Sequence, residues 1–224
     1  MPTSGTATWN IEIVDVVEEA YERAGLEART GYDYRTALRS LNIMSAEWSN
    51  RGLNLWTVQE NSLVLTPGQA TYSLPADTID IIQTAIRINT SGTPLDYVIS
   101  RIGVGDYAGL PNKTTRGRPI QIYVNRQLAP QFTLWPVPDL NYTILYWTMR
   151  RIQDASNPTN TMDLPVRFVP CLVAGLAFHI AMKRPEAAAR IPLLKQEYME
   201  QFQLAADEDR GREPARFVPW IGSP

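Results

Sequence analysis

The chain has very few of the side chains from which metal centres and most nucleophilic sites are built. Its 224 residues include one cysteine, Cys171, and one histidine, His179. A zinc site needs several cysteine or histidine ligands, so two such residues exclude a site of that kind. A lone cysteine forms no internal disulfide, and nothing in the composition indicates an oxidising compartment. We therefore expect no metal and no cofactor.

Long apolar runs and phosphate-binding motifs are also absent. No stretch of 18 apolar residues occurs, so we expect no membrane span. Residues 1–9 have neither a basic start nor an apolar core, and they are not typical of a signal peptide. No GxxxxGK[ST] or GxGxxG motif is present to cradle a nucleotide phosphate. The formal net charge is −2, so the whole chain has no general attraction to nucleic acid or to anionic lipid.

Catalytic arrangements are hard to build from the residues that remain. His179 lies in an apolar segment, where we expect a core histidine bonded to a neighbour and not a member of a Ser-His-Asp triad. Cys171 is roughly 12 Å away along a helix, too far for a nucleophile–base pair. We predict that the chain is not an enzyme. A peptidoglycan or glycan hydrolase remains an alternative, and it would show two carboxylates facing each other across a cleft. Glu47 and Glu60 are the candidates, because they lie near Trp48 and Trp56 in the sequence.

Helical periodicity occupies both ends of the chain. Apolar residues recurring at three- and four-residue steps predict four helices, at 10–25, 33–52, 169–180 and 192–211. Asn10 and Asp33 can cap the first two, and Gly25 and Gly52 can end them. The third helix lies in a segment without charged side chains, so it should be buried on most sides. The early and late helices must pack together, because neither pair buries its apolar stripe alone.

The middle of the chain has the pattern of short strands separated by Gly- and Pro-rich turns. Strands are predicted at 62–65, 71–74, 79–88, 95–100, 120–125, 131–135 and 142–149. The first two flank residues 66–69, whose Pro67 and Gly68 are typical of a type II turn, and we expect them to form a hairpin. The last strand is apolar on both faces and should be central or covered on both sides. These features favour a sandwich or small barrel.

One stretch, residues 33–75, joins the two patterns and carries a resemblance. It reads LN-M--EW---G--LW and then L-L-PG---Y-LP. This pattern and the order of elements resemble the head-to-tail adaptor proteins of short-tailed bacteriophages, also called tail tubular protein A or packaged-DNA stabilisation proteins. The matching residues are Leu41, Asn42, Met44, Glu47, Trp48, Gly52, Leu55, Trp56, Leu63, Leu65, Pro67, Gly68, Tyr72, Leu74 and Pro75.

The resemblance implies a helical bundle with an inserted β domain, which agrees with the periodicity. We expect an α+β fold: a bundle of N- and C-terminal helices, an inserted antiparallel β-sandwich-like domain and an extended C-terminal tail. The expected boundaries are 1–57 with 164–211 for the helical domain, 58–163 for the β domain and 212–224 for the tail. Trp48 and Trp56 flank Gly52, and we predict that they anchor the domain junction.

The resemblance also implies a function in the virion. Adaptors of this family are made in the host cytoplasm, dock beneath the portal ring at the head–tail junction, extend the DNA channel and provide the attachment surface for the next tail component. They form rings of twelve subunits. The implied partners are therefore the portal protein, further copies of the chain, and a downstream tail or nozzle protein. A glycan-binding β module, which would show an exposed aromatic platform on a strand face, is the second alternative.

The C-terminal tail is a candidate docking segment. Its prolines are incompatible with helix and with central-strand pairing, yet it is too apolar for an ordinary solvated terminus. We expect it to bind a groove on the portal or on a neighbouring subunit, a groove on its own chain being the alternative. The residues concerned are Arg212, Arg216, Phe217, Val218, Trp220 and Ile221.

Two charged groups are further candidates for contacts between subunits or with DNA. The first predicted helix has an acidic face that is either solvated or faces a basic neighbour: Glu12, Asp15, Glu18, Glu19 and Glu22. Between 101 and 126, five cations stand against the single Asp106: Arg101, Lys113, Arg116, Arg118 and Arg126. They could meet DNA phosphates without sequence specificity, an acidic partner surface, or the acidic helix of the next subunit, and a solvated loop is the remaining alternative.

Overall fold

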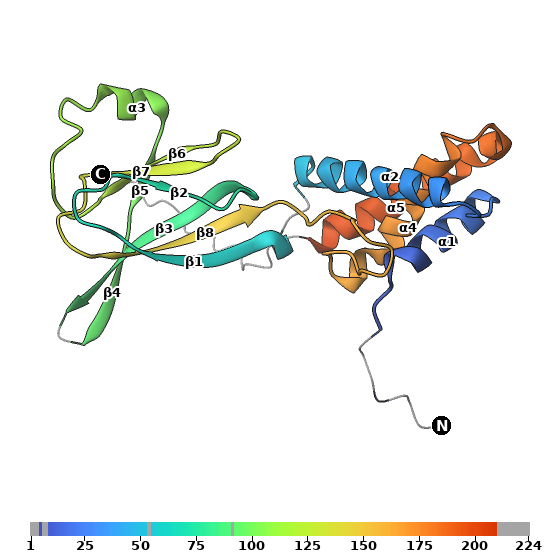
Figure 1. Ribbon diagram of the computed structural model, residues 1–224, viewed down its shortest axis with the longest axis horizontal. Coiled ribbons are helices and arrows are strands. Elements are labelled where there is room, and N and C mark those ends of the chain that lie inside the picture. The colour runs from blue at the N-terminus through green and yellow to red at the C-terminus, as the bar shows by residue number, and fades with distance from the viewer. Residues whose placement is uncertain (1–4, 6–8, 53–54, 91, 210–224) are drawn as a thin grey trace, which may run out of the picture. The chain divides into compact units, whose positions relative to one another are not determined.

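The chain combines helices and strands in an α+β fold, as predicted. The computed structural model describes residues 5, 9–52, 55–90 and 92–209 (Figure 1). Contacts divide these residues into two compact units. One, the helical unit, contains the described residues up to Leu55 and from Asp154 onward, and the other, the β unit, is Trp56–Gln153. The predicted tail, 212–224, lies outside the described residues.

The helical unit is built around one central helix. Its main helices are α1 (Ile13–Ala24), α2 (Gly31–Asn50), α4 (Val169–Ala181) and α5 (Ile191–Glu208), with short 3-10 turns at η2 (Val166–Phe168) and η3 (Pro185–Arg190). Helix α4 packs against α1, α2 and α5, and ten of its 13 residues are buried. The absence of charge in this segment therefore predicted its position in the core correctly. Apolar burial of this kind contributes roughly 25 cal/mol per Å² removed from water.

The first two helices begin differently from the prediction. Helix α2 is capped by Thr30, whose hydroxyl accepts from the Asp33 N–H, while the Asp33 carboxylate accepts from the Thr30 N–H at 3.1 Å. Asp33 is thus the third residue of a capping box and not the cap itself. Asn10 does not cap α1 either. The first N–H groups of α1 donate to the backbone oxygens of Asn160 and Pro158 at 2.8 and 2.9 Å, so a distant loop replaces the side-chain cap.

The β unit contains two four-stranded sheets that share one core. The first sheet has the order β1 (Val58–Val64), β8 (Thr143–Arg150), β3 (Thr78–Thr90) and β4 (Thr93–Val98). The second has the order β2 (Thr71–Ser73), β7 (Gln131–Trp135), β6 (Gln121–Asn125) and β5 (Ser100–Ile102). All pairs are antiparallel except β5 with β6. The predicted central position of the 142–149 strand is confirmed, because β8 lies between β1 and β3 (Figure 1).

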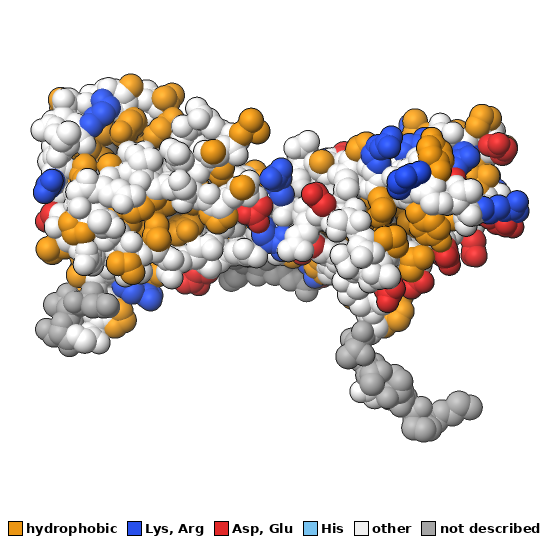
Figure 2. Space-filling view, viewed as in Figure 1, with side chains coloured by type: hydrophobic (Ala, Val, Ile, Leu, Met, Phe, Trp, Pro, Cys, Tyr) orange, Lys and Arg blue, Asp and Glu red, His pale blue; other side chains and the backbone are white. Residues whose placement is uncertain are grey.

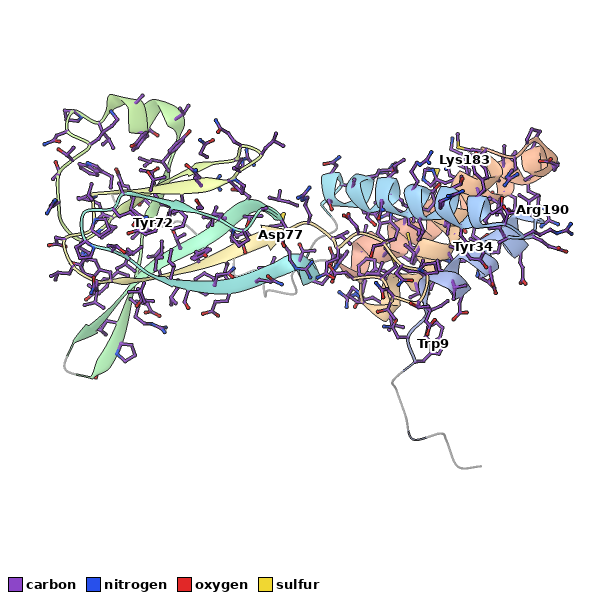
Figure 3. The ribbon with its side chains drawn as sticks, viewed as in Figure 1. Trp9, Tyr34, Tyr72, Asp77, Lys183 and Arg190 are labelled. Carbon is purple, nitrogen blue, oxygen red and sulfur yellow. The ribbon has the colours of Figure 1, made fainter. Side chains whose placement is uncertain are left out.

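Side chains from both sheets form a single buried cluster. From the first sheet come Ile81, Ile86, Ile144 and Tyr146, and from the second Tyr72, Ile122, Phe132 and Leu134. The Tyr72 and Phe132 rings stack with their centroids 5.4 Å apart. Figure 3 shows Tyr72 among the strands of this unit. The predicted sandwich-like arrangement follows from this shared core.

The predicted hairpin between 62–65 and 71–74 is wrong. Strand β1 pairs with β8, and β2 pairs with β7 in the other sheet. The turn itself forms as expected, since Gly68 has a φ of 84° and the Gln69 N–H donates to the Thr66 oxygen at 3.1 Å. The sequence of the turn specified that the chain reverses direction, but not which strands pair on either side of it. Here the chain crosses from the first sheet to the second at the turn. The Tyr72 hydroxyl fixes the crossing by accepting from the Thr66 N–H at 2.9 Å.

A second crossing was also missed. The predicted strand 95–100 is two strands, β4 and β5, on either side of Ile99. Ile99 is 6% exposed and belongs to the shared core. Its apolar side chain made the segment look continuous, although the chain passes there from the first sheet to the second. The short helix α3 (Val104–Gly109) follows β5.

Candidate interaction surfaces

The two tryptophans predicted to form the junction lie in different units. Trp48 is in the helical core, 1% exposed. Its indole N–H donates to the Tyr198 hydroxyl at 3.0 Å, and its ring packs against Phe168 and Phe202 at centroid distances of 6.3 and 6.5 Å. Trp56 is half-buried and belongs to η1 (Leu55–Thr57), at the start of the β unit. Trp48 is therefore a core residue of α2, and the joint role of the pair stays a prediction.

The acidic face of α1 is present, but two of its members are engaged within the helical unit. Glu18 accepts a hydrogen bond from the Tyr34 hydroxyl at 2.7 Å, and this bond raises the pKa of Tyr34 to about 12. Glu19 pairs with Arg23 at 2.8 Å. The remaining carboxylates are exposed and have no ion pair with another described residue: Glu12, Asp15 and Glu22. Figure 2 shows acidic side chains gathered along this part of the unit.

The five cations between 101 and 126 do not converge on one contact. Arg101 and Arg126 both bind Asp80, at 2.8 and 3.2 Å. Lys113 donates to the carbonyl oxygens of Ala108 and Leu110 at the end of α3, at 3.2 Å each. These three cations therefore have partners within the β unit, although all are exposed.

The other two cations of this group stand apart from Asp80. The Arg118 guanidinium lies 4.6 Å from the centroid of the Tyr97 ring, a cation–π contact. The Arg116 side chain lies beside the turn at Gly68. Neither has an ion pair with a described residue. Arg116 and Arg118 are thus the members of the group best able to meet an external anion.

Cys171 and His179, residues of the types most often used in nucleophilic and acid–base catalysis, lie in an apolar environment that disfavours their charged forms. Burial raises the pKa of the Cys171 thiol to about 12, so it is not a thiolate near neutral pH. Burial lowers the pKa of His179, whose ring lies 5.5 Å from Phe178 and 6.3 Å from Tyr198. The expected bond from a neighbour to the histidine is missing at Nε2, which is buried without a hydrogen-bond partner among the described residues. Nor do those residues contain a group of three potential metal ligands.

Aromatic rings on the outer face of the second sheet are partly covered. Tyr123 of β6 stacks against Tyr107 of α3 with centroids 5.0 Å apart. The Trp135 indole N–H donates to the Asn112 oxygen at 2.9 Å. Both rings are half-buried. Among the described residues, this face therefore lacks the open aromatic platform that would favour the glycan-binding alternative.

A cavity of about 670 Å³ lies in the helical unit, beside the α1–α2 connection. Asp33, 7% exposed, is its most buried charged residue and pairs with Arg184. Burial alone would raise the Asp33 pKa, but hydrogen bonds from Thr30 and Arg29 and the charge of Arg184 lower it overall. The charges that line the cavity largely neutralise one another. We therefore interpret the cavity as a structural feature of the α1–α2 connection and not as a binding site.

The surface that sequence reasoning missed is the edge of the first sheet. All six residues of β4 are exposed, and Leu95, Tyr97 and Val98 are 44%, 41% and 70% exposed. Pro94 near its start was the available signal, because proline in a sheet is confined mainly to edge strands. The opposite edge, β1, exposes Val64 by 63%.

Comparison with known families identifies the class of protein. The family model described as SU10 adaptor protein matches residues 10–220. The chain belongs to the SU10 adaptor protein family. The resemblance to phage head-to-tail adaptors is thereby confirmed. No curated protein matches the chain.

Membership of the SU10 adaptor family makes the chain a structural component of a phage particle. It implies self-assembly and contacts with portal and tail proteins, and a structural role in place of an enzymatic one. None of the described helices combines the length and the apolarity needed to cross a membrane. The acidic face of α1, the cations Arg116 and Arg118 and the β4 edge are among the described surfaces open to such partners.

Proposed function

We propose that the chain forms a cyclic ring at the head–tail junction, docks beneath the portal protein, extends the DNA channel and provides the attachment surface for the next tail or nozzle protein. The single observation that carries this is the adaptor family match over residues 10–220. The resemblance implies twelve subunits. Two compact units in one chain support the proposal, because each can offer its own surface to a different partner.

Contacts between neighbouring subunits are heterologous in a cyclic ring, so one surface must meet a different surface of the next copy. In the proposed ring, Glu12, Asp15 and Glu22 of α1 face basic residues of an adjacent subunit or partner. Their exposure and the lack of described ion pairs support this role. Complementary charges of this kind mainly set the specificity and rate of association.

The C-terminal tail grips the portal or a neighbouring subunit in this proposal. The residues that make the contact are those predicted from the sequence: Arg212, Arg216, Phe217, Val218, Trp220 and Ile221. Large apolar side chains favour a groove, and Pro214 and Pro219 reduce the ordering entropy lost on docking. Trp48 and Trp56 hold the junction between the helical and β domains of each subunit.

Any contact with packaged DNA is made through phosphates and is independent of sequence. Arg116 and Arg118 suit such a contact better than Arg101 and Arg126, whose charges are shared with Asp80. With Arg116 and Arg118 on the inner wall of the ring, their secondary function is to contact the phosphates of DNA in the channel.

The test is to mix the purified chain with the portal protein of the same phage and to image the product by electron microscopy. A closed ring bound to one end of the portal is the expected result, with portal alone as the control. A chain that stays monomeric and leaves the portal unoccupied at micromolar concentration would contradict the proposal. Counting subunits in class averages tests the number twelve separately.

A further inference from the structure

The first sheet of the β unit has two long edges without a strand partner among the described residues. Its order is β1-β8-β3-β4, so β1 and β4 lie at opposite ends. They contain seven and six residues, whereas the edge strands of the second sheet, β2 and β5, contain three each. Short edges are a common protection against pairing with another chain, and long edges are open to it. The first sheet is therefore the one that can be extended.

The side chains on these edges favour a partner. Leu95 and Val98 of β4 are 44% and 70% exposed, and Val64 of β1 is 63% exposed. Neither strand contains lysine, and the residues of kinds that can protect an edge are Glu60 in β1 and Pro94 and Asp96 in β4. Figure 1 shows the β3–β4 hairpin projecting beyond the second sheet, and all six residues of β4 are exposed.

Strand direction favours a second copy of the chain as the partner. Strands β1 and β8, β8 and β3, and β3 and β4 are each antiparallel, so β1 and β4 run in opposite directions. A rotation about an axis roughly parallel to the strands adds a neighbouring copy beside the sheet and keeps each strand's direction. The β4 strand of one subunit would then meet β1 of the next in the antiparallel sense, as within the sheet itself. The two edges differ, which is what a heterologous ring contact requires.

We propose that β4 of one subunit pairs with β1 of the next copy, so that the first sheet continues from subunit to subunit. The proposal rests on the ring described under the proposed function and specifies one of its contacts. Backbone hydrogen bonds of a new ladder supply affinity, and alternate side chains on each strand supply specificity.

The faces of the two strands select a register. Leu95 lies opposite Ile88 of β3, and Leu63 lies opposite Ile144 of β8, so both point to the core side of the sheet. Pairing Leu95 with Leu63 of the next copy keeps core faces together. This register sets Asp96 opposite Ser62 and Val98 opposite Glu60. A shift of two residues in one direction would set Asp96 opposite Glu60, and like charges directly opposite are destabilising. The same shift in the other direction would leave only three residues of each strand paired.

Val98 therefore offers a charge test of the contact. Within one subunit β4 and β1 are three strand spacings apart, roughly 14 Å, so position 98 meets Glu60 directly only between copies. Val98→Glu should lower the ring assembly rate at low salt at least tenfold, as measured by light scattering. Val98→Lys, the matched variant at the same exposed site, should assemble at the wild-type rate or faster. Val98→Glu combined with Glu60→Lys should restore assembly.

A disulfide test reads the register independently. Ser62→Cys and Asp96→Cys together should give covalent subunit ladders on oxidation of assembled rings, because antiparallel partners are 4.5–5.5 Å apart at Cα and fall within disulfide range. The buried Cys171 does not compete. Ser73→Cys with Asp96→Cys is the control pair and should give no ladder.

The outcomes separate the two proposals. Rings that form equally in Val98→Glu and Val98→Lys, or in neither, overturn the strand pairing, and so does the absence of a ladder in rings of the Ser62→Cys, Asp96→Cys chain. In those cases the ring itself stands. If the wild-type chain forms no ring with or without the portal, the proposed function fails.

Discussion

At the residue scale, the helical unit depends on a few large side chains held by polar contacts. Trp48, Phe168 and Phe202 form an aromatic group, and Tyr198 accepts the indole hydrogen bond. The spacing of apolar residues placed Trp48 on the buried face of its helix. Nothing in the sequence indicated that the indole N–H would meet a tyrosine 150 residues later, because that contact depends on how α2 and α5 pack.

Trp48→Ala should lower the free energy of unfolding by about 3–5 kcal/mol, since it removes a fully buried side chain and leaves a cavity. Urea unfolding followed by circular dichroism measures the change. Trp9→Ala is the control, because Trp9 is 63% exposed, and it should change stability by less than about 0.5 kcal/mol. Equal effects of the two substitutions would contradict the assignment of Trp48 to the core.

Asp33→Asn should destabilise the chain by about 1–3 kcal/mol near neutral pH, because it weakens the buried contacts with Arg184 and Thr30. The pKa of Asp33 is lowered in the folded state, so its stabilisation is full above the ordinary aspartate pKa of 3.8 and is lost as pH falls through the folded value. Thermal melts from pH 7 down to pH 2 should therefore bring wild type and variant together at the acidic end. A difference that stays constant over that range would rule out the carboxylate as its source.

At the element scale, the sequence specified where helices end and where turns form better than it specified which strands lie side by side. Gly25 ends α1 in the left-handed conformation, with a φ of 73°, as its position after the apolar stripe predicted. The turn at Gly68 also formed as predicted, yet the strands on either side joined different sheets. Asn10 lost its predicted role because the loop at 158–160 reached the first turn of α1. Local chemistry decides helix ends and turns, whereas packing decides which strands pair and which loop contacts a helix end.

Gly25→Ala should cost about 1–2 kcal/mol for the left-handed backbone, and more if the Arg190 side chain cannot move. A Cβ at this position would lie 2.6 Å from the Arg190 guanidinium carbon. Gly31→Ala is the matched control, because a Cβ there meets nothing within 4 Å and the residue is helical. Chemical denaturation should therefore rank Gly25→Ala below wild type and Gly31→Ala at or above it. The reverse order would disprove the role of Gly25.

The acidic face of α1 is tested by neutralising its three exposed carboxylates together, as Glu12→Gln, Asp15→Asn and Glu22→Gln. Ring assembly should slow several-fold at low salt and much less at high salt, because screening weakens contacts between exposed charges. Stopped-flow light scattering at two ionic strengths measures this. Glu27→Gln with Glu186→Gln, two exposed carboxylates outside α1, is the control. Unchanged rates at low ionic strength would mean that the face is only solvated.

At the scale of the whole molecule, the class of fold and the family could be predicted from the sequence. The switch from helical to strand periodicity and back is a property of long segments, so single errors did not alter it. The partner surfaces were harder. The five cations looked like one patch because they are close in sequence, but Asp80, twenty or more residues earlier, engages two of them. The β4 edge was missed because exposure of a strand edge depends on sheet order.

Deleting residues 212–224 should leave the thermal midpoint of the isolated protomer within about 1 °C of wild type and should abolish co-sedimentation with the portal. The expectation follows from the tail's proline spacing and apolar side chains, which suit a groove on another molecule. Normal portal binding by the truncated chain would refute the docking role. A drop in the midpoint of several degrees would place the tail in its own protomer.

The chain enters the β unit through β1 and leaves it through β8, and these two strands are neighbours in the first sheet. Val58 at the start of β1 pairs with Met149 near the end of β8. A force applied through the segments before β1 and after β8 therefore acts at the same end of one hydrogen-bonded ladder. The two strands bear this force in parallel. A pull on the unit does not slide β1 past β8. Such a tether divides a load between two segments of chain.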